Sequence, residues 1–229
     1  MSTFVLVPGA GGSSWQWHLV VAHLEERGHR AVAVDLPAGD DSAGLAEYSR
    51  VVRAAVPADD DVVLVAQSMG GLVAPIVCTQ VAVRLLIMLN AMIPAPGETG
   101  GEWWAATGQS IAMADHAREL GLDPADLEDP AVLYGHDVPP QLFAEAERRT
   151  TDQSGTPFTE PWPLRSWPGV PTRVLAARED RLFPISLQRR VAHERLGLPV
   201  DVIDGGHLAL LSRPAVVADR LDAYWREIA

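Results

Sequence analysis

The chain has 229 residues, a length that predicts one domain, or one domain with a small insertion. Its 30 acidic and 18 basic residues give a formal net charge of −12, which argues against nucleic acid or an anionic membrane surface as a partner. All the basic residues are arginines, which excludes mechanisms that need a lysine, and the single cysteine, Cys78, excludes an internal disulfide.

Short apolar runs alternate with helical patterns from the start of the chain to about residue 89. Runs of this kind, apolar at almost every position, are typical of strands buried on both faces of a parallel sheet. The alternation predicts a mostly parallel, doubly wound α/β sheet with right-handed crossovers. We expect strands at residues 4–7, 31–34, 62–66 and 83–89, and helices at residues 15–27, 42–56 and 68–80.

The alternation stops between about residues 91 and 168, a stretch rich in proline, glycine and tryptophan. Helical patterns occur there near residues 102–120 and 140–150. We interpret this stretch as a small helical cap inserted over the carboxyl edge of the sheet. A long irregular linker is the alternative, but linkers rarely carry so much apolar bulk. The bulk comes from Trp103, Trp104, Trp162 and Trp167.

After the cap the strand and helix alternation resumes and continues to residue 228. We expect strands at residues 172–176 and 200–203, and helices at residues 185–196 and 213–228. The prediction is therefore a single domain over residues 1–229, interrupted by the cap at about 91–168.

A predicted strand runs directly into Ala66-Gln67-Ser68-Met69-Gly70, and a helix follows. This is the arrangement of a nucleophile elbow, in which a sharp turn presents a serine and leaves room only for small residues two positions away. The helix that follows points its N-terminus at the same place, which favours a developing oxyanion. The alternative interpretation is that Ser68 only caps that helix.

A serine nucleophile needs a base, and the base needs a carboxylate. We expect His207 to be the base, because it follows a predicted strand end and because Gly205 and Gly206 free the backbone to present its ring. Asp180 follows the preceding strand and is the expected acid, with Glu179 as the alternative. The order serine, acid, histidine along the chain is that of the α/β-hydrolases.

An oxyanion hole requires two backbone N–H donors. One is expected from Met69, the residue after the nucleophile, and the other from the loop after the first strand, from Ala10 or else from Gly11. The glycines of this loop let the backbone approach a substrate closely. A dinucleotide-binding loop is the competing interpretation, but its spacing of three glycines is not met.

Four motifs together resemble the α/β-hydrolase superfamily over nearly the whole chain. They are Val5-Leu6-Val7-Pro8-Gly9-Ala10, Ala66-Gln67-Ser68-Met69-Gly70-Gly71, Glu179-Asp180 and Gly206-His207. Residues 9–17 are similar to the branch of plant methyl esterases, hydroxynitrile lyases and bacterial esterases, although Pro8 stands where that branch usually has histidine. The resemblance implies an α/β-hydrolase fold that works without a metal or other cofactor.

The same resemblance favours ester hydrolysis over cyanohydrin cleavage. Hydroxynitrile lyases of that branch depend on a threonine at the position of Ala10 and on an active-site lysine, and this chain has neither. Epoxide hydrolases and dehalogenases carry aspartate at the position of Ser68. We therefore expect a serine hydrolase that cleaves a small-molecule carboxylic ester through an acyl-enzyme. A thioesterase, lactonase or carbon–carbon hydrolase with the same triad is one alternative, and a non-catalytic ligand-binding relative is another.

Substrate specificity is expected to lie in the cap, whose bulky side chains suit an apolar or aromatic group. The candidate lining residues are Trp103, Trp104, Met113, Tyr134, Phe143 and Phe158. No apolar run reaches the roughly 18 residues of a membrane span, so we expect no membrane partner and a cytoplasmic protein. We expect a monomer or a homodimer, with Cys78 in the core.

Overall fold

The computed structural model describes residues 2–58 and 61–229 and contains one six-stranded, all-parallel sheet. The strands lie in the order β2-β1-β3-β4-β5-β6, so the predicted α/β fold class is confirmed. They are β1 (Thr3–Val7), β2 (Arg30–Ala33), β3 (Val62–Gln67), β4 (Leu85–Leu89), β5 (Thr172–Ala177) and β6 (Val200–Ile203). The direction of winding reverses between β1 and β3, and ligands of such sheets bind beyond the carboxyl ends at that switch point.

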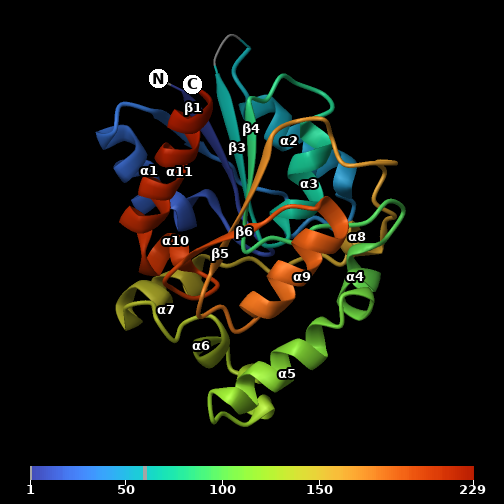
Figure 1. The fold of residues 1–229 in the computed structure, drawn as a ribbon, viewed down its shortest axis with the longest axis vertical. Coiled ribbons are helices and arrows are strands. Elements are labelled where there is room, and N and C mark those ends of the chain that lie inside the picture. Colours follow the sequence, from blue (N-terminus) through green and yellow to red (C-terminus); the bar gives the residue numbers. More distant parts are fainter. Residues whose placement is uncertain (1, 59–60) are drawn as a thin grey trace.

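Helices cover both faces of the sheet, as Figure 1 shows. On one face, Phe4, Leu6 and Val63 pack against side chains of α1 (His18–Glu26), α10 (Ala209–Ser212) and α11 (Pro214–Ile228). On the other face, Val5 and Leu64 pack against α2 (Leu45–Ala55), α3 (Gly70–Val77) and α9 (Ile185–Leu196). Every residue of β1, β3 and β4 is buried, because these strands have helices on both sides.

Several expected helices begin or end elsewhere, for local reasons. The helix expected over residues 102–120 is two helices, α4 (Gly100–Ala106) and α5 (Gln109–Glu119), because Gly108 between them has a φ of 63°. The start of the helix expected at residues 15–27 is a separate 3₁₀ turn, η1 (Ser14–Trp17). The helix expected over residues 68–80 is α3, which begins at Gly70 and ends at Val77 with Pro75 inside it.

The helices between β4 and β5 lie beyond the carboxyl ends of the strands, at the bottom of Figure 1. We call residues 100–159 the cap. It contains α4, α5, η2 (Pro124–Glu128), α6 (Pro130–Leu133), α7 (Pro140–Arg149) and α8 (Thr156–Thr159). Two buried indoles tie this region and the segment directly after it to the domain: Trp103 donates to the carbonyl of Ile93 and Trp162 to that of Leu72, each at 3.0 Å.

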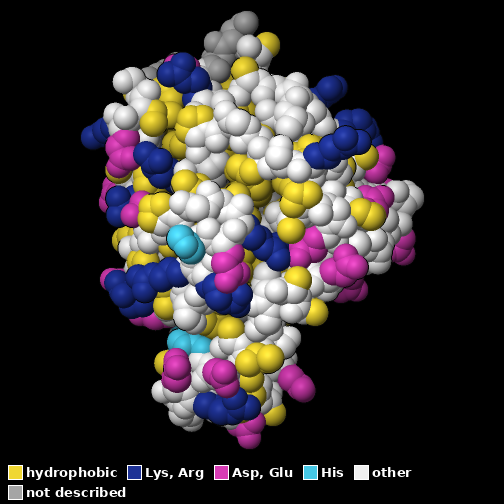
Figure 2. Space-filling view, turned by 45° about the vertical axis from the view of Figure 1, so that its right-hand side comes forward, with side chains coloured by type: hydrophobic (Ala, Val, Ile, Leu, Met, Phe, Trp, Pro, Cys, Tyr) yellow, Lys and Arg dark blue, Asp and Glu magenta, His cyan; other side chains and the backbone are white. Residues whose placement is uncertain are grey.

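Charged side chains are interspersed over the face drawn in Figure 2, with arginines beside carboxylates. Within single helices, Arg118 pairs with Asp115 at 2.6 Å and Arg190 with Glu194 at 3.3 Å. Over residues 2–58 and 61–229, no helix has both the length and the apolar character that a membrane crossing requires.

Candidate active site

Ser68 lies at the carboxyl end of β3 in a strained backbone conformation, with a φ of 52°. A residue other than glycine rarely adopts this left-handed conformation, and it persists only where the surrounding structure imposes it. Here the Ser68 N–H faces the carbonyl of Asn90 at 3.2 Å, and the Ser68 carbonyl accepts from Met92 N at 2.9 Å. Because Gly70 approaches Pro8 so closely that a Cβ there would lie 2.9 Å from the Pro8 carbonyl oxygen, the turn needs a small residue at that position.

His207 and Asp180 meet in a buried hydrogen bond. His207 Nδ1 lies 2.9 Å from Asp180 Oδ2, and the two residues are only 3% and 0% exposed. The other oxygen of Asp180 accepts from the backbone N–H groups of Leu182 and Phe183, both at 2.9 Å. Both oxygens of this buried carboxylate therefore have hydrogen-bond partners, as a buried polar group requires. Glu179, the alternative acid, is exposed to solvent.

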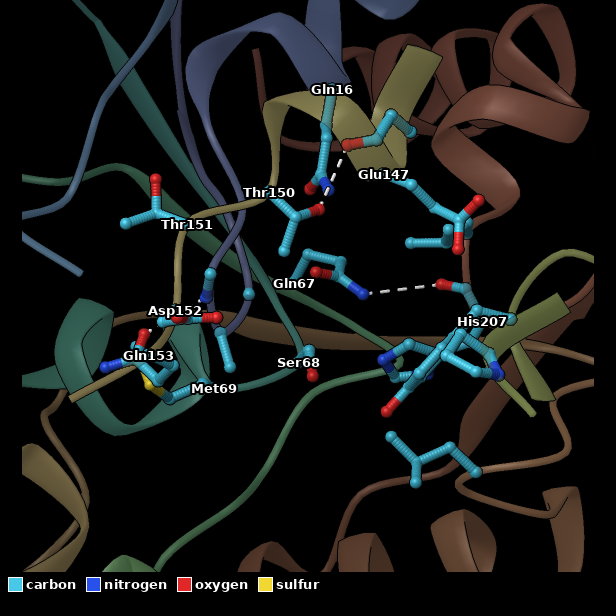
Figure 3. A pocket seen from close by; sticks show the side chains of 18 of the residues that line it. Gln16, Gln67, Ser68, Met69, Glu147, Thr150, Thr151, Asp152, Gln153 and His207 are labelled. Carbon is cyan, nitrogen blue, oxygen red and sulfur yellow. Dashed lines mark hydrogen bonds between the residues drawn. The ribbon is translucent and has the colours of Figure 1, made fainter. Parts of the chain in front are cut away.

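The backbone of His207 is held from the sheet by two amide side chains. Its carbonyl accepts from Gln67 Nε2 at 3.3 Å and from Asn90 Nδ2 at 3.2 Å. Its ring packs edge-on against Phe183, with 5.3 Å between the ring centroids. Because Nδ1 faces Asp180, the second ring nitrogen is left for the cavity, where Ser68 also lies (Figure 3).

Ser68 and His207 line the same cavity, but no hydrogen bond joins their side chains within the described chain. Contacts between a nucleophile and its base are often long in the absence of substrate and tighten in the reacting complex. The structure therefore brings the three candidate residues together, with the His207–Asp180 contact already formed.

Two backbone N–H groups beside Ser68 are free to bind an oxyanion. Those of Ala10 and Met69 have no hydrogen-bond partner in residues 2–58 and 61–229. The N–H of Gly11, the alternative donor, is already bonded to Gln153 Oε1 at 3.1 Å. The loop after β1 lies directly against Ser68, because a Cβ at Gly9 would come within 2.7 Å of Ser68 Cβ.

The cap holds this loop in place through residues that follow α7. Thr151 N donates to the Gly11 carbonyl at 3.0 Å, and Gln153 accepts from Gly11 N. Gln153 Nε2 in turn donates to the hydroxyl of Tyr48 at 2.9 Å. Gly11 has a φ of 64°, and a Cβ there would collide with the Thr151 carbonyl at 2.5 Å, so the contact requires glycine.

The cavity in front of Ser68 has a volume of about 480 Å³ and combines an apolar wall with a polar one. Four of the six cap residues named from the sequence line it: Trp104, Tyr134, Phe143 and Phe158. Trp103 and Met113 do not. Trp103 is a buried residue of α4 whose N–H donates to the Ile93 carbonyl. Met113 packs against the buried cluster that also contains Val5 and Leu64. Burial and, after it, the charge of Asp180 raise the pKa of Tyr134, so its hydroxyl stays protonated.

The sequence provided no signal for other residues that line the same cavity. The polar wall comes from the loop and 3₁₀ turn after β1 and from the C-terminal part of the cap. The spacing of these two segments along the chain gives no sign that they are neighbours in space. The residues concerned are Gln16, Gln67, Met92, Glu147, Thr150, Thr151, Asp152, Gln153 and Leu182 (Figure 3). Within the described chain, no three histidine, cysteine, aspartate or glutamate side chains gather in a way that could hold a metal ion.

Comparison with known proteins identifies relatives that cover nearly the whole chain. The profile of the Alpha/beta hydrolase family matches residues 4–220. The chain is 38% identical over 255 residues to the probable esterase PIR7A of Oryza sativa subsp. indica, covering 95% of this chain and 94% of that protein. It is 22% identical over 249 residues to methylesterase 2 of Arabidopsis thaliana, covering 95% and 94%.

Solved structures also resemble this one over their full length. Polyneuridine aldehyde esterase superposes with a TM-score of 0.78 at 21% identity, covering 98% of this chain and 99% of that one. The pyrethroid hydrolase PytH superposes with a TM-score of 0.78 at 25% identity, covering 100% and 98%.

Proposed function

Because the chain belongs to the alpha/beta hydrolase family, we propose that it is a serine esterase that cleaves a small-molecule carboxylic ester through Ser68, His207 and Asp180. The observation that carries this proposal is the buried 2.9 Å contact between His207 and Asp180 beside a serine held at positive φ. Relatives whose names describe them as esterases, among them PIR7A at 38% identity, support the choice of an ester.

The reaction is an acyl transfer in two steps. Ser68 Oγ attacks the ester carbonyl while His207 Nε2 takes its proton, and the alcohol leaves with a proton from His207. Water, activated by the same nitrogen, then hydrolyses the acyl-enzyme. Asp180 Oδ2 accepts from Nδ1, which leaves Nε2 unprotonated at the start and stabilises the imidazolium that forms.

The negative charge of each tetrahedral intermediate falls on the former carbonyl oxygen. The free N–H groups of Ala10 and Met69 are positioned to bind that oxygen, and the N-terminus of α3 adds a favourable dipole. One such donor contributes on the order of 3 kcal/mol to lowering the barrier. The cavity supports a substrate with an apolar part against Trp104 and Phe158 and a polar part toward Gln153.

A fluorophosphonate tests the proposal because it phosphonylates an activated serine irrespective of the natural substrate. The intact mass of the folded protein is expected to rise by one adduct, and Ser68→Ala is expected to prevent the increase. Absence of an adduct on the folded wild-type protein would show that Ser68 is not an activated nucleophile. That outcome favours the non-catalytic, ligand-binding alternative.

The same triad also serves thioesterases, lactonases and carbon–carbon hydrolases, which differ in the pocket. Turnover of p-nitrophenyl esters of graded chain length, measured beside thioesters and lactones, separates these classes and reports the size of the cavity. We expect the esters to be the best substrates. Cyanide release from mandelonitrile is expected to be absent, because the chain has Ala10 and no lysine.

A further inference from the structure

One segment of the cap contacts both of the loops that carry Asp180 and His207. We call residues 132–137, which are the last two residues of α6 and the first part of the segment that leads to α7, the brace. Arg181 Nη1, one residue after Asp180, donates to the Val132 carbonyl at 2.7 Å. The N–H of Gly206, one residue before His207, donates to Asp137 Oδ2 at 2.8 Å. The two loops are also bonded to each other, since Glu179 N donates to the Gly205 carbonyl at 2.9 Å.

The brace approaches the loop that carries His207 too closely for a side chain at Gly206. A Cβ at Gly206 would lie 2.7 Å from both Asp137 Oδ1 and His136 Nε2. The structure therefore supplies a second reason for the paired glycines before His207. They expose the backbone N–H of Gly206 to a carboxylate from the cap as well as freeing the chain to present the imidazole.

Three polar atoms around this contact are buried and have no hydrogen-bond partner in the described part of the chain: His136 Nε2, Asp137 Oδ1 and Arg181 Nε. Burial, and then the charge of Arg181, lower the pKa of His136, while Asp137 opposes both effects. Asp137 also opposes the lowering of the Arg181 pKa by burial. Buried polar groups without a partner destabilise a folded protein. A contribution to folding stability therefore does not explain why this cluster is present.

We propose that Asp137 is a positioning residue that holds the backbone of His207 from the cap side, so that the imidazole meets Ser68 and Asp180 together. Gln67 and Asn90 hold the carbonyl of His207 from the sheet, and Asp137 holds the preceding N–H from the opposite side. The loop that carries His207 is thus held at two consecutive residues, at Gly206 from the cap and at His207 from the sheet. This inference rests on the proposed function, because it assigns Asp137 a role in the same triad.

Loss of this contact should slow the chemistry rather than substrate binding. A displacement of about 1 Å in a reacting group can cost on the order of 100-fold in rate. Asp137 lies behind His207 and does not line the cavity, so KM is expected to change little. In Asp137→Ala the His207–Asp180 contact loosens, and the base is then less stabilised as its imidazolium. The loss is therefore expected in kcat for an ester substrate and not in KM.

The experiment measures the rate of fluorophosphonate labelling of Ser68, from pH 5 to pH 9, in wild type and three variants. Asp137→Ala removes the acceptor, and Asp137→Asn keeps an oxygen but loses the charge that strengthens the bond. Asp123→Ala is the matched control, because Asp123 is also a cap aspartate that accepts one backbone N–H, from Ala125 at 3.0 Å. Circular dichroism and the thermal midpoint establish that each variant is folded.

We expect Asp137→Ala to label about 10- to 100-fold more slowly than wild type. Asp137→Asn should label at a rate between those of Asp137→Ala and wild type, and Asp123→Ala should label at the wild-type rate. Labelling of Asp137→Ala at the wild-type rate, or of Asp137→Asn as slowly as Asp137→Ala, would overturn the proposal. If Asp137→Ala does not fold, Asp137→Asn decides: an intermediate rate supports the proposal and the wild-type rate overturns it. Failure of the wild-type protein to label at all is a different result, which contradicts the proposed function itself.

Discussion

The side-chain amide of Asn90 donates to the main-chain carbonyl of His207 at 3.2 Å, across 117 residues of sequence. The same side chain accepts from the N–H of Ala177 at 2.7 Å, where β5 ends. Asn90 itself follows β4, is completely buried and has a φ of 45°. It therefore joins the ends of two strands to the loop that carries the histidine.

Replacing Asn90 with alanine should lower both stability and activity. The change leaves the Ala177 N–H and the carbonyls of Gly206 and His207 without this partner, and each buried group left unsatisfied costs about 1–3 kcal/mol. Urea denaturation measures the free energy of unfolding, and steady-state kinetics measure kcat. Ser49→Ala, which removes only a buried hydroxyl bonded within α2, is the control and should change kcat little. An Asn90→Ala protein with wild-type kcat would show that this contact does not position His207.

Ser68 and His207 are expected to act as one unit. Ser68→Ala and His207→Ala should each remove nearly all turnover, and the double variant should be little slower than either alone. The measurement is kcat for a p-nitrophenyl ester in the three variants, with circular dichroism to check folding. Losses that multiply in the double variant would mean that the two side chains work independently.

Gly9→Ala should disturb the oxyanion loop. Its Cβ would lie 2.5 Å from Gln67 Oε1 and 2.7 Å from Ser68 Cβ, so the loop must move away from the nucleophile. We expect a loss in kcat on the order of 100-fold, because a shift of about 1 Å in a reacting group has that effect. Gly169→Ala is the matched control, since a Cβ there meets nothing within 4 Å. Equal kcat in the two variants would contradict this role for the close contact.

Gln153→Ala should weaken the same loop from the cap side. The change removes the acceptor for Gly11 N and the donor to Tyr48, while the bond from Thr151 N to the Gly11 carbonyl remains. We expect kcat to fall by less than the roughly 100- to 1,000-fold that follows complete loss of one oxyanion donor. Gln80→Ala, at an exposed position, is the control. An unchanged kcat in Gln153→Ala would show that the loop keeps its geometry without this side chain.

His136 should make the protein less stable in mild acid. Burial first, and then Arg181, lower its pKa in the folded state below the usual value of 6.5. The unfolded chain therefore binds the proton more readily, and the contribution of His136 to stability, full above pH 6.5, is lost as the pH falls toward its folded pKa. We expect the free energy of unfolding to fall more between pH 7.5 and pH 5.5 in wild type than in His136→Gln. An equal fall in both proteins would contradict the lowered pKa.

Local patterns were enough to predict the sheet and to bring the candidate site residues to one edge of it. All six expected strands are present in the parallel sheet, although the one expected at residues 83–89 begins at Leu85. The carboxyl ends of parallel strands share one edge, so Ser68, Asp180 and His207 could be expected near each other from the strand ends alone. The division of the expected helix into α4 and α5 at Gly108 could not be predicted, because a glycine inside a helical pattern does not by itself require a positive φ.

The amino-acid sequence by itself therefore determined the strands and the candidate triad with its order of serine, acid and histidine along the chain. These features depend on short-range apolar patterns and on small residues at a tight turn. Only the tertiary structure decided how the triad and oxyanion loops are held. Asn90 reaches His207, Asp137 reaches Gly206 and Gln153 reaches Gly11 through hydrogen bonds between a side chain and a distant backbone. Such contacts leave no periodic signal in the sequence, since any polar side chain at the right point in space can make them.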